Sequence, residues 1–324
     1  EIRFCDWSSD VCSSDLDCSM ACGGDPEPLP EAIIARRAAR LCAVAENTWH
    51  EVGGEPPVYV IGTEVPVPGG ATESLGELAV TSPAAARDTI KTHQSAFAEI
   101  GLDQAWSRAI ALVVQPGVEF DHHKVIDYRP NEARALSAFI ADDEQFVFEA
   151  HSTDYQTASN LQALVRDHFA ILKVGPGATY ALRETLWALA AIAHELPGGA
   201  AEEDLRTTAL EVMRTDSRHW RSYYHDAERE TLDLQFSLSD RIRYYWPHPR
   251  IKQAYESLLA RLRTVPLPLT LLSQFMPQQY EAVRAGRLRA NVDELLNEGI
   301  AAALRPYMRA CGGSSSQELR VNGD

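Results

Sequence analysis

The sequence predicts an α/β protein with a parallel β-sheet. Short apolar runs rich in β-branched and aromatic residues alternate with longer helix-forming stretches through the first 199 residues, which is the pattern of repeated βαβ units. Polar residues follow each run, and no G-x-G-x-x-G follows the first one. Both features favour a (β/α)8 barrel of the TIM type over an open doubly wound sheet. Only about four and a half of the eight strands of a barrel are visible, so we expect an incomplete barrel.

The predicted elements are bounded by residues that favour strand ends and helix caps. Pro56 and Pro57 precede the second strand, while Ser82 followed by Pro83 is a preferred start of a helix. The sequence Pro-Gly-Gly at 197–199 ends the last helix of this region. The predicted strands cover residues 17–20, 58–63, 109–115, 146–149 and 169–174, and the predicted helices cover residues 31–46, 82–100, 130–140, 159–168 and 178–195.

The pattern changes beyond residue 199, where helical stretches follow one another without strands. We therefore expect a partial barrel over residues 17–199, a helical extension over residues 200–312 and a disordered tail over residues 313–324. The helices predicted in the extension cover residues 202–215, 250–263, 277–285 and 292–308.

The first sixteen residues, EIRFCDWSSDVCSSDL, differ from the rest of the chain. They have neither the basic and apolar regions of a signal peptide nor the Arg-rich pattern of a transit peptide. The triplet Ser-Ser-Asp occurs twice, from Ser8 and from Ser13. Because the stretch resembles translated sequencing-adapter read-through, we expect a non-native leader at residues 1–16.

Net charge, hydropathy and cysteine spacing indicate which kinds of binding partner and cell compartment to expect. The formal net charge is −16, with 30 basic and 46 acidic residues, which argues against a nucleic-acid partner. No run of eighteen apolar residues occurs, so no membrane-spanning helix is expected. The six cysteines lack the paired C-x-x-C spacing of zinc ribbons and are expected to be reduced thiols of a cytoplasmic protein.

Polar residues at strand ends are the first candidate functional residues. The fourth predicted strand ends in Glu149 and continues with His151 and Asp154. Side chains alternate along a strand, so Glu149 and His151 are expected on the same side. Asp17 and Glu64 end two earlier strands, and a barrel would bring all five side chains to one face.

These side chains are of the types that bind metals. Carboxylate oxygens and imidazole nitrogens are ligands for a catalytic divalent ion such as Zn²⁺ or Mn²⁺. The sequence therefore predicts Asp17, Glu64, Glu149 and His151 as metal ligands. The alternative is that these groups form a hydrogen-bonded network that stabilises the rim of the barrel.

The turn after the fifth predicted strand is a candidate phosphate site. Gly175 and Gly177 flank a proline at the start of a helix, where free amides attract anions. Lys173 lies just before the turn and could pair with a phosphate or with Glu149. Gly-Pro-Gly is also an ordinary strand-to-helix junction.

A basic and aromatic cluster lies at residues 241–246. Arg241 and Arg243 could bind a sugar phosphate or a partner subunit, since Arg and aromatic side chains are enriched in binding hot spots. The cluster could equally pack the seam between the barrel and the helical extension.

Several loops resemble signature segments of a known family. The segments are YVIGTEVPVPGG at residues 59–70, VQPGVEFDH at 114–122, EAHSTDYQT at 149–157 and SLSDRIRYYWPH at 237–248. They are similar to the non-catalytic subunit of class II D-tagatose-1,6-bisphosphate aldolase, and the likeness runs from Asp17 to about Cys311. The resemblance implies that Asp17 ends the fourth strand of a (β/α)8 barrel, so that about strands 4–8 are expected here.

The same resemblance implies two possible functions. One is a subunit that stabilises and activates a separate zinc-dependent aldolase, which cleaves tagatose bisphosphate in galactitol and amino-sugar catabolism to glyceraldehyde 3-phosphate and dihydroxyacetone phosphate. The other is a metal-dependent 4-epimerase that interconverts fructose 6-phosphate and tagatose 6-phosphate. In an epimerase, Glu64, Glu149 and Asp154 would be the catalytic carboxylates.

Overall fold

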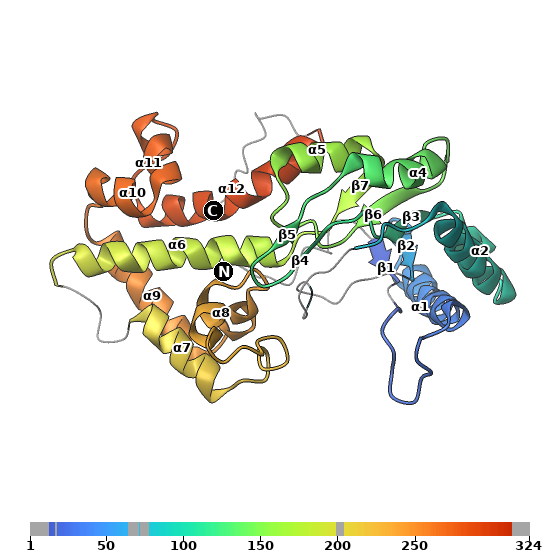
Figure 1. Cartoon of the computed structure of the whole chain (residues 1–324), viewed down its shortest axis with the longest axis horizontal. Coiled ribbons are helices and arrows are strands. Elements are labelled where there is room, and N and C mark those ends of the chain that lie inside the picture. The colour runs from blue at the N-terminus through green and yellow to red at the C-terminus, as the bar shows by residue number, and fades with distance from the viewer. Residues whose placement is uncertain (1–12, 17, 64–70, 72–77, 199–203, 313–324) are drawn as a thin grey trace. The chain divides into compact units, whose positions relative to one another are not determined.

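The computed structural model describes residues 13–16, 18–63, 71, 78–198 and 204–312 (Figure 1). The chain divides into two compact units. The first unit takes its residues from 1–67, 76–119 and 126–173, and the second takes its residues from 68–75, 120–125 and 174–324. The predicted division at residue 199 stays a prediction.

The first unit is built on a five-stranded parallel sheet (Figure 1). Each of these strands lies beside the one before it in the chain, so the winding never reverses as it does in a doubly wound sheet. The predicted α/β class is confirmed, and the partial barrel stays a proposal. In spatial order the strands are β1 (Ser13–Asp15), β2 (Val58–Gly62), β3 (Ala109–Val114), β6 (Val147–Ala150) and β7 (Phe169–Leu172).

Helices follow the strands of the first unit. α1 packs against α2, and α2 packs against both α3 and α4, so the helices lie side by side in nearly their chain order. The Ser82 hydroxyl accepts a hydrogen bond from the Ala85 amide at 3.1 Å, which is the predicted cap. The helices are α1 (Glu31–Val52), α2 (Pro83–Glu99), α3 (Asp103–Trp106), α4 (Pro130–Ile140) and α5 (Ala158–Arg166).

The first strand lies earlier than the sequence predicted. β1 ends at Asp15, and residues 18–20 form no strand. Asp15 pairs with Val60 of β2, and the Leu16 amide donates to the Val60 carbonyl at 3.0 Å. Because this pairing uses backbone groups, even a Ser-Ser-Asp triplet with low strand propensity can form it. The non-native origin of residues 1–16 stays a prediction.

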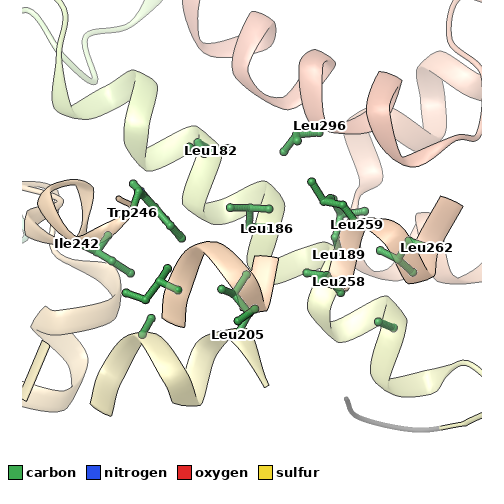
Figure 2. Packing of buried hydrophobic residues seen from close by; sticks show 14 of the residues in the cluster. Leu182, Leu186, Leu189, Leu205, Ile242, Trp246, Leu258, Leu259, Leu262 and Leu296 are labelled. Atoms are coloured by element: carbon green, nitrogen blue, oxygen red, sulfur yellow. The ribbon is translucent and has the colours of Figure 1, made fainter. Parts of the chain in front are cut away.

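The second unit is helical in its described residues beyond 173 (Figure 1). Its core surrounds α6, whose Leu182, Leu186 and Leu189 are buried together with Leu258 of α9 and Leu296 of α12 (Figure 2). A helix that is apolar on several faces is typically buried, as α6 is. The elements are α6 (Pro176–Glu195), α7 (Leu205–Thr215), α8 (Glu230–Phe236), η1 (Arg241–Tyr245), α9 (Pro249–Arg263), α10 (Leu269–Phe275), α11 (Pro277–Arg284) and α12 (Val292–Ala310).

Two short strands, β4 (Glu119–Phe120) and β5 (Val125–Ile126), form a separate pair in the stretch that the sequence predicted to be a loop. Among the helices in the described part of the chain, none is both long and apolar enough to cross a membrane.

Candidate functional site

The site begins at the carboxyl end of β6. Glu149 lies in the strand, and His151 follows it. Nε2 of His151 lies 2.7 Å from Oε1 of Glu149, so the two side chains project to the same side, as strand alternation requires. The side chain of Glu149 is 1% exposed and that of His151 is 16% exposed.

Two further side chains complete the cluster. Nζ of Lys173 lies 3.1 Å from Oδ2 of Asp15 and 3.4 Å from Oε1 of Glu149. One donor atom from each of Asp15, Glu149 and His151 lies within 4.8 Å of the other two. We call Asp15, Glu149, His151 and Lys173 the strand-end cluster.

The strand-end cluster joins the two edges of the sheet. Asp15 belongs to β1, and Lys173 follows β7, the strand at the opposite edge. In a flat sheet, four spacings would separate these strands by about 19 Å, which an aspartate and a lysine side chain cannot span. Their contact at 3.1 Å therefore requires a strongly curled sheet.

The electrostatics of the cluster follow from burial and from close charges. Burial raises the pKa of Asp15, and the nearby Glu149 carboxylate raises it further, although Lys173 opposes both. For Lys173, burial lowers the pKa, but the carboxylates of Glu149 and Asp15 outweigh burial and leave the pKa above its ordinary value. The lysine is therefore held as a cation between two carboxylates.

The donor set suits a divalent ion. Two carboxylates and an imidazole are ligands that Zn²⁺ and Mn²⁺ accept. Metal–ligand distances of about 2.0–2.2 Å place two ligands at most about 4.4 Å apart. The donor atoms of Asp15, Glu149 and His151, within 4.8 Å of one another, need only small rotations to reach that arrangement. Among the described residues these three form a possible metal-binding group.

The other predicted site residues do not belong to this group of donor atoms in the described part of the chain. Asp17 and Glu64 lie outside the described residues. Asp154 is buried in the loop after β6 and is not among the three donors that converge. Asp15 was missed because residues 1–16 were assigned to a leader, and no strand pattern singles it out.

The predicted phosphate turn lies in the second unit. α6 begins at Pro176 with Gly175 as its N-cap, and Gly177 follows in the first turn. Thr179 in that turn donates a hydrogen bond to Oδ2 of Asp240 at 2.6 Å. The start of the helix is therefore tied to Asp240, the residue just before η1, which carries the two predicted arginines.

The two predicted arginines differ in their remaining hydrogen-bonding capacity. Arg243 donates to the carbonyl of Ser239 and, at 3.2 Å, to that of Asp240. Arg241 stacks on the Tyr223 ring at 3.7 Å, and its Nε donates to the His219 carbonyl at 2.6 Å. Nη1 of Arg241 is buried and has no hydrogen-bond partner among the described residues. Of the two, Arg241 is therefore the better candidate for an anion.

The second unit contains a buried ion pair that the sequence analysis did not predict. Nε of Arg183 lies 3.3 Å from Oδ1 of Asp240, and the guanidinium lies 4.0 Å from the centre of the Tyr180 ring. Burial raises the pKa of Asp240, against the opposing effect of Arg183. The one available signal was an arginine within the largely apolar helix α6.

Fold and site together define an α/β protein whose curled parallel sheet carries a carboxylate–imidazole cluster suited to a divalent metal. More specifically, the chain belongs to the family described as D-tagatose-1,6-bisphosphate aldolase subunit GatZ/KbaZ-like, which it matches over residues 13–312. The resemblance drawn from the loop segments is confirmed.

Solved structures give a second comparison. The crystal structure of a probable tagatose 6 phosphate kinase from Sinorhizobium meliloti 1021 is 46% identical to this chain, and the match covers 92% of this chain and 73% of that one, with a TM-score of 0.84. The fructuronate-tagaturonate epimerase UxaE from Cohnella laeviribosi is 13% identical over 87% of this chain and 51% of its own, with a TM-score of 0.38.

Proposed function

We propose that this chain is a non-catalytic subunit that stabilises and activates a separate, catalytic class II D-tagatose-1,6-bisphosphate aldolase subunit. The observation that supports the proposal is the match of residues 13–312 to a family described as a subunit of this aldolase. In this role the chain acts in the cytoplasm, in D-tagatose 6-phosphate catabolism of the galactitol and amino-sugar type. The catalytic partner releases glyceraldehyde 3-phosphate and dihydroxyacetone phosphate.

Mixing the purified subunits tests this role. The activity of the catalytic aldolase subunit is followed over hours, alone and with an excess of this chain. We expect a longer half-life of aldolase activity, with co-elution of the two proteins from a sizing column. An unchanged half-life without co-elution would contradict the role. Albumin at the same concentration controls for non-specific protection.

A second candidate function is favoured by the strand-end cluster. It is a metal-dependent 4-epimerase acting on ketohexose 6-phosphates. Asp15, Glu149 and His151 would hold the ion, which when bound supplies Lewis-acid polarisation of the ketose carbonyl. The observation that favours this function is the convergence of a buried carboxylate, Glu149, with the more exposed carboxylate of Asp15 and the imidazole of His151 at the ends of strands, an arrangement that is frequent in active sites.

Inversion at C4 requires a base and the reversible breaking of one bond. A carboxylate takes the proton of the C4 hydroxyl, the C3–C4 bond breaks, and its electron pair stays with the three-carbon ketone half. Return of the pair to the opposite face of the aldehyde, with return of the proton, inverts C4. The carboxylates proposed for this proton transfer are Glu64, Glu149 and Asp154.

The phosphate of such a substrate needs cationic or amide donors. Gly175, Gly177, Arg241 and Arg243 of the second unit are proposed for this role, and Lys173 is the alternative. The buried Nη1 of Arg241, which lacks a partner among the described residues, favours Arg241 most, because an unpaired buried donor is costly unless a ligand accepts its hydrogen bond.

Incubation with fructose 6-phosphate and Mn²⁺ distinguishes the two functions. The purified chain is assayed without a partner, and tagatose 6-phosphate is sought by NMR. Formation of the product, lost in His151→Ala, supports the epimerase. Absence of the product together with protection of the aldolase subunit supports the auxiliary role.

A further inference from the structure

The ammonium of Lys173 lies where a bound cation would be needed. It is 3.1 Å from Asp15 and 3.4 Å from Glu149, and both carboxylates belong to the possible metal-binding group. Glu149 is 1% exposed, so its charge cannot be compensated by water. A buried carboxylate without a partner strongly destabilises a fold, and Lys173 adds an ammonium to the contact that Glu149 already makes with His151.

We propose that Lys173 is an internal counter-ion that a divalent metal must displace from the strand-end cluster. The inference rests on the metal site of the proposed epimerase function. It adds that the Lys173 ammonium competes with the metal ion for the carboxylates of Asp15 and Glu149. Before the ion enters, the ammonium offsets one of the two negative charges of Asp15 and Glu149, and it turns away from both carboxylates once the ion is bound.

Charge and geometry make the two cations mutually exclusive. An ammonium and a divalent ion about 4 Å apart repel strongly even at the effective dielectric constant of a protein. Lys173 has room to leave, because its side chain is 44% exposed and ends a flexible four-carbon stem. Asp15, Glu149 and His151 stay in place, since all three are needed as ligands. Two carboxylates and one ammonium carry a net charge of −1, whereas two carboxylates and one divalent ion are neutral, so the exchange completes the charge balance of the site.

Calorimetric titration with Mn²⁺ tests the exchange. Wild type is compared with Lys173→Met, which is similar in length but uncharged, and with Lys173→Arg, which keeps the charge. We expect Lys173→Met to bind Mn²⁺ at least tenfold more tightly than wild type, and Lys173→Arg to bind no more tightly than wild type. Lys91→Met, at an exposed position of α2, is the matched control and should bind like wild type.

Equal or weaker Mn²⁺ binding by Lys173→Met would overturn the exchange while leaving the metal site intact. Absence of Mn²⁺ binding by all variants would overturn both the exchange and the metal site. The two failures are therefore distinguishable.

A measurement on wild type covers the case in which Lys173→Met does not fold. The rate of acylation of Lys173 is followed by peptide mass spectrometry with and without Mn²⁺. Release of the ammonium from both carboxylates should raise that rate at least threefold, while the rate at Lys91 stays constant. An unchanged rate at Lys173 under saturating Mn²⁺ would overturn the proposal.

Discussion

The sequence predicted Asp17 as a metal ligand, whereas the structure brings Asp15 to the candidate site. Substituting each aspartate in turn tests which of the two binds the metal. The structure places Asp15 in the possible metal-binding group, so Asp15→Asn should weaken Mn²⁺ binding by at least tenfold, since it removes one of three charged or basic ligands. Calorimetric titration of both variants measures the effect. Loss of binding in Asp17→Asn but not in Asp15→Asn would show that the predicted ligand is the correct one. Asp142→Asn, at an exposed position after α4, is the control.

A second test at this scale concerns His93, which is fully buried in α2. Burial lowers its pKa, although its Nδ1 lies 2.9 Å from the Thr89 carbonyl. The unfolded chain therefore binds more protons than the folded chain just below about pH 6.5, and the free energy of unfolding falls as the pH falls through that range.

His93→Leu should remove this loss. In wild type, this effect lowers the free energy of unfolding by at most about 1.4 kcal/mol per pH unit, and His93→Leu should not show it. Urea unfolding of both proteins between pH 7 and pH 5 measures it, and parallel pH profiles of wild type and His93→Leu would contradict the assignment.

Residues in regular strands were the easiest to predict. Strand alternation alone brings Glu149 and His151 together, and their 2.7 Å contact agrees with it. Asp15 and Arg183 could not be found in this way, because their partners Lys173 and Asp240 lie far along the chain. Such long-range pairs depend on sheet curvature and helix packing, which local patterns do not encode.

At the scale of elements, the packing of α6 against α12 makes a sharp prediction. A Cβ at Gly299 would lie 2.0 Å from Oγ1 of Thr185 and 3.0 Å from its Cβ. Gly299→Ala should therefore destabilise the chain by about 1–3 kcal/mol through overpacking. Thermal or urea unfolding gives the value.

The double variant Thr185→Ala/Gly299→Ala provides the control. Removing the hydroxyl and the methyl group of Thr185 relieves the nearest contacts, so the double variant should be less destabilised than the sum of the two single variants. Additive losses would show that the close approach of α6 and α12 is not the cause.

Helices with strong end signals were predicted closely. The Ser82-Pro83 start of α2 and the Pro249 and Pro277 starts of α9 and α11 lie within a residue of the expected positions, because proline at the first turn fixes the backbone. Short elements such as α8 and α10 were missed, since seven residues give too little periodicity to recognise.

At the scale of the whole molecule, metal binding should appear as added stability. A ligand that binds only the folded chain adds about 2.7 kcal/mol at one hundred times its dissociation constant. Mn²⁺ should raise the midpoint of thermal unfolding, and EDTA should reverse the rise. Scanning calorimetry measures the shift. The same rise in Asp15→Asn would place the ion elsewhere.

The class of the fold was accessible from sequence, and the predicted barrel implied a curled sheet, but the residues that meet across the sheet edges were not accessible. Alternating strands and helices predict parallel neighbours, and the strand order agrees. The contact between Asp15 of β1 and Lys173, the residue after β7, is seen only in the structure.

The contact between Asp15 and Lys173 means that the strand-end cluster also connects the two edges of the sheet. Asp15 comes from one border of the sheet and Lys173 from just beyond the other, so the ammonium links β1 to the residue after β7. A metal held by Asp15, Glu149 and His151 would instead link β1 to β6, so the bound cation would decide which strand β1 is tied to.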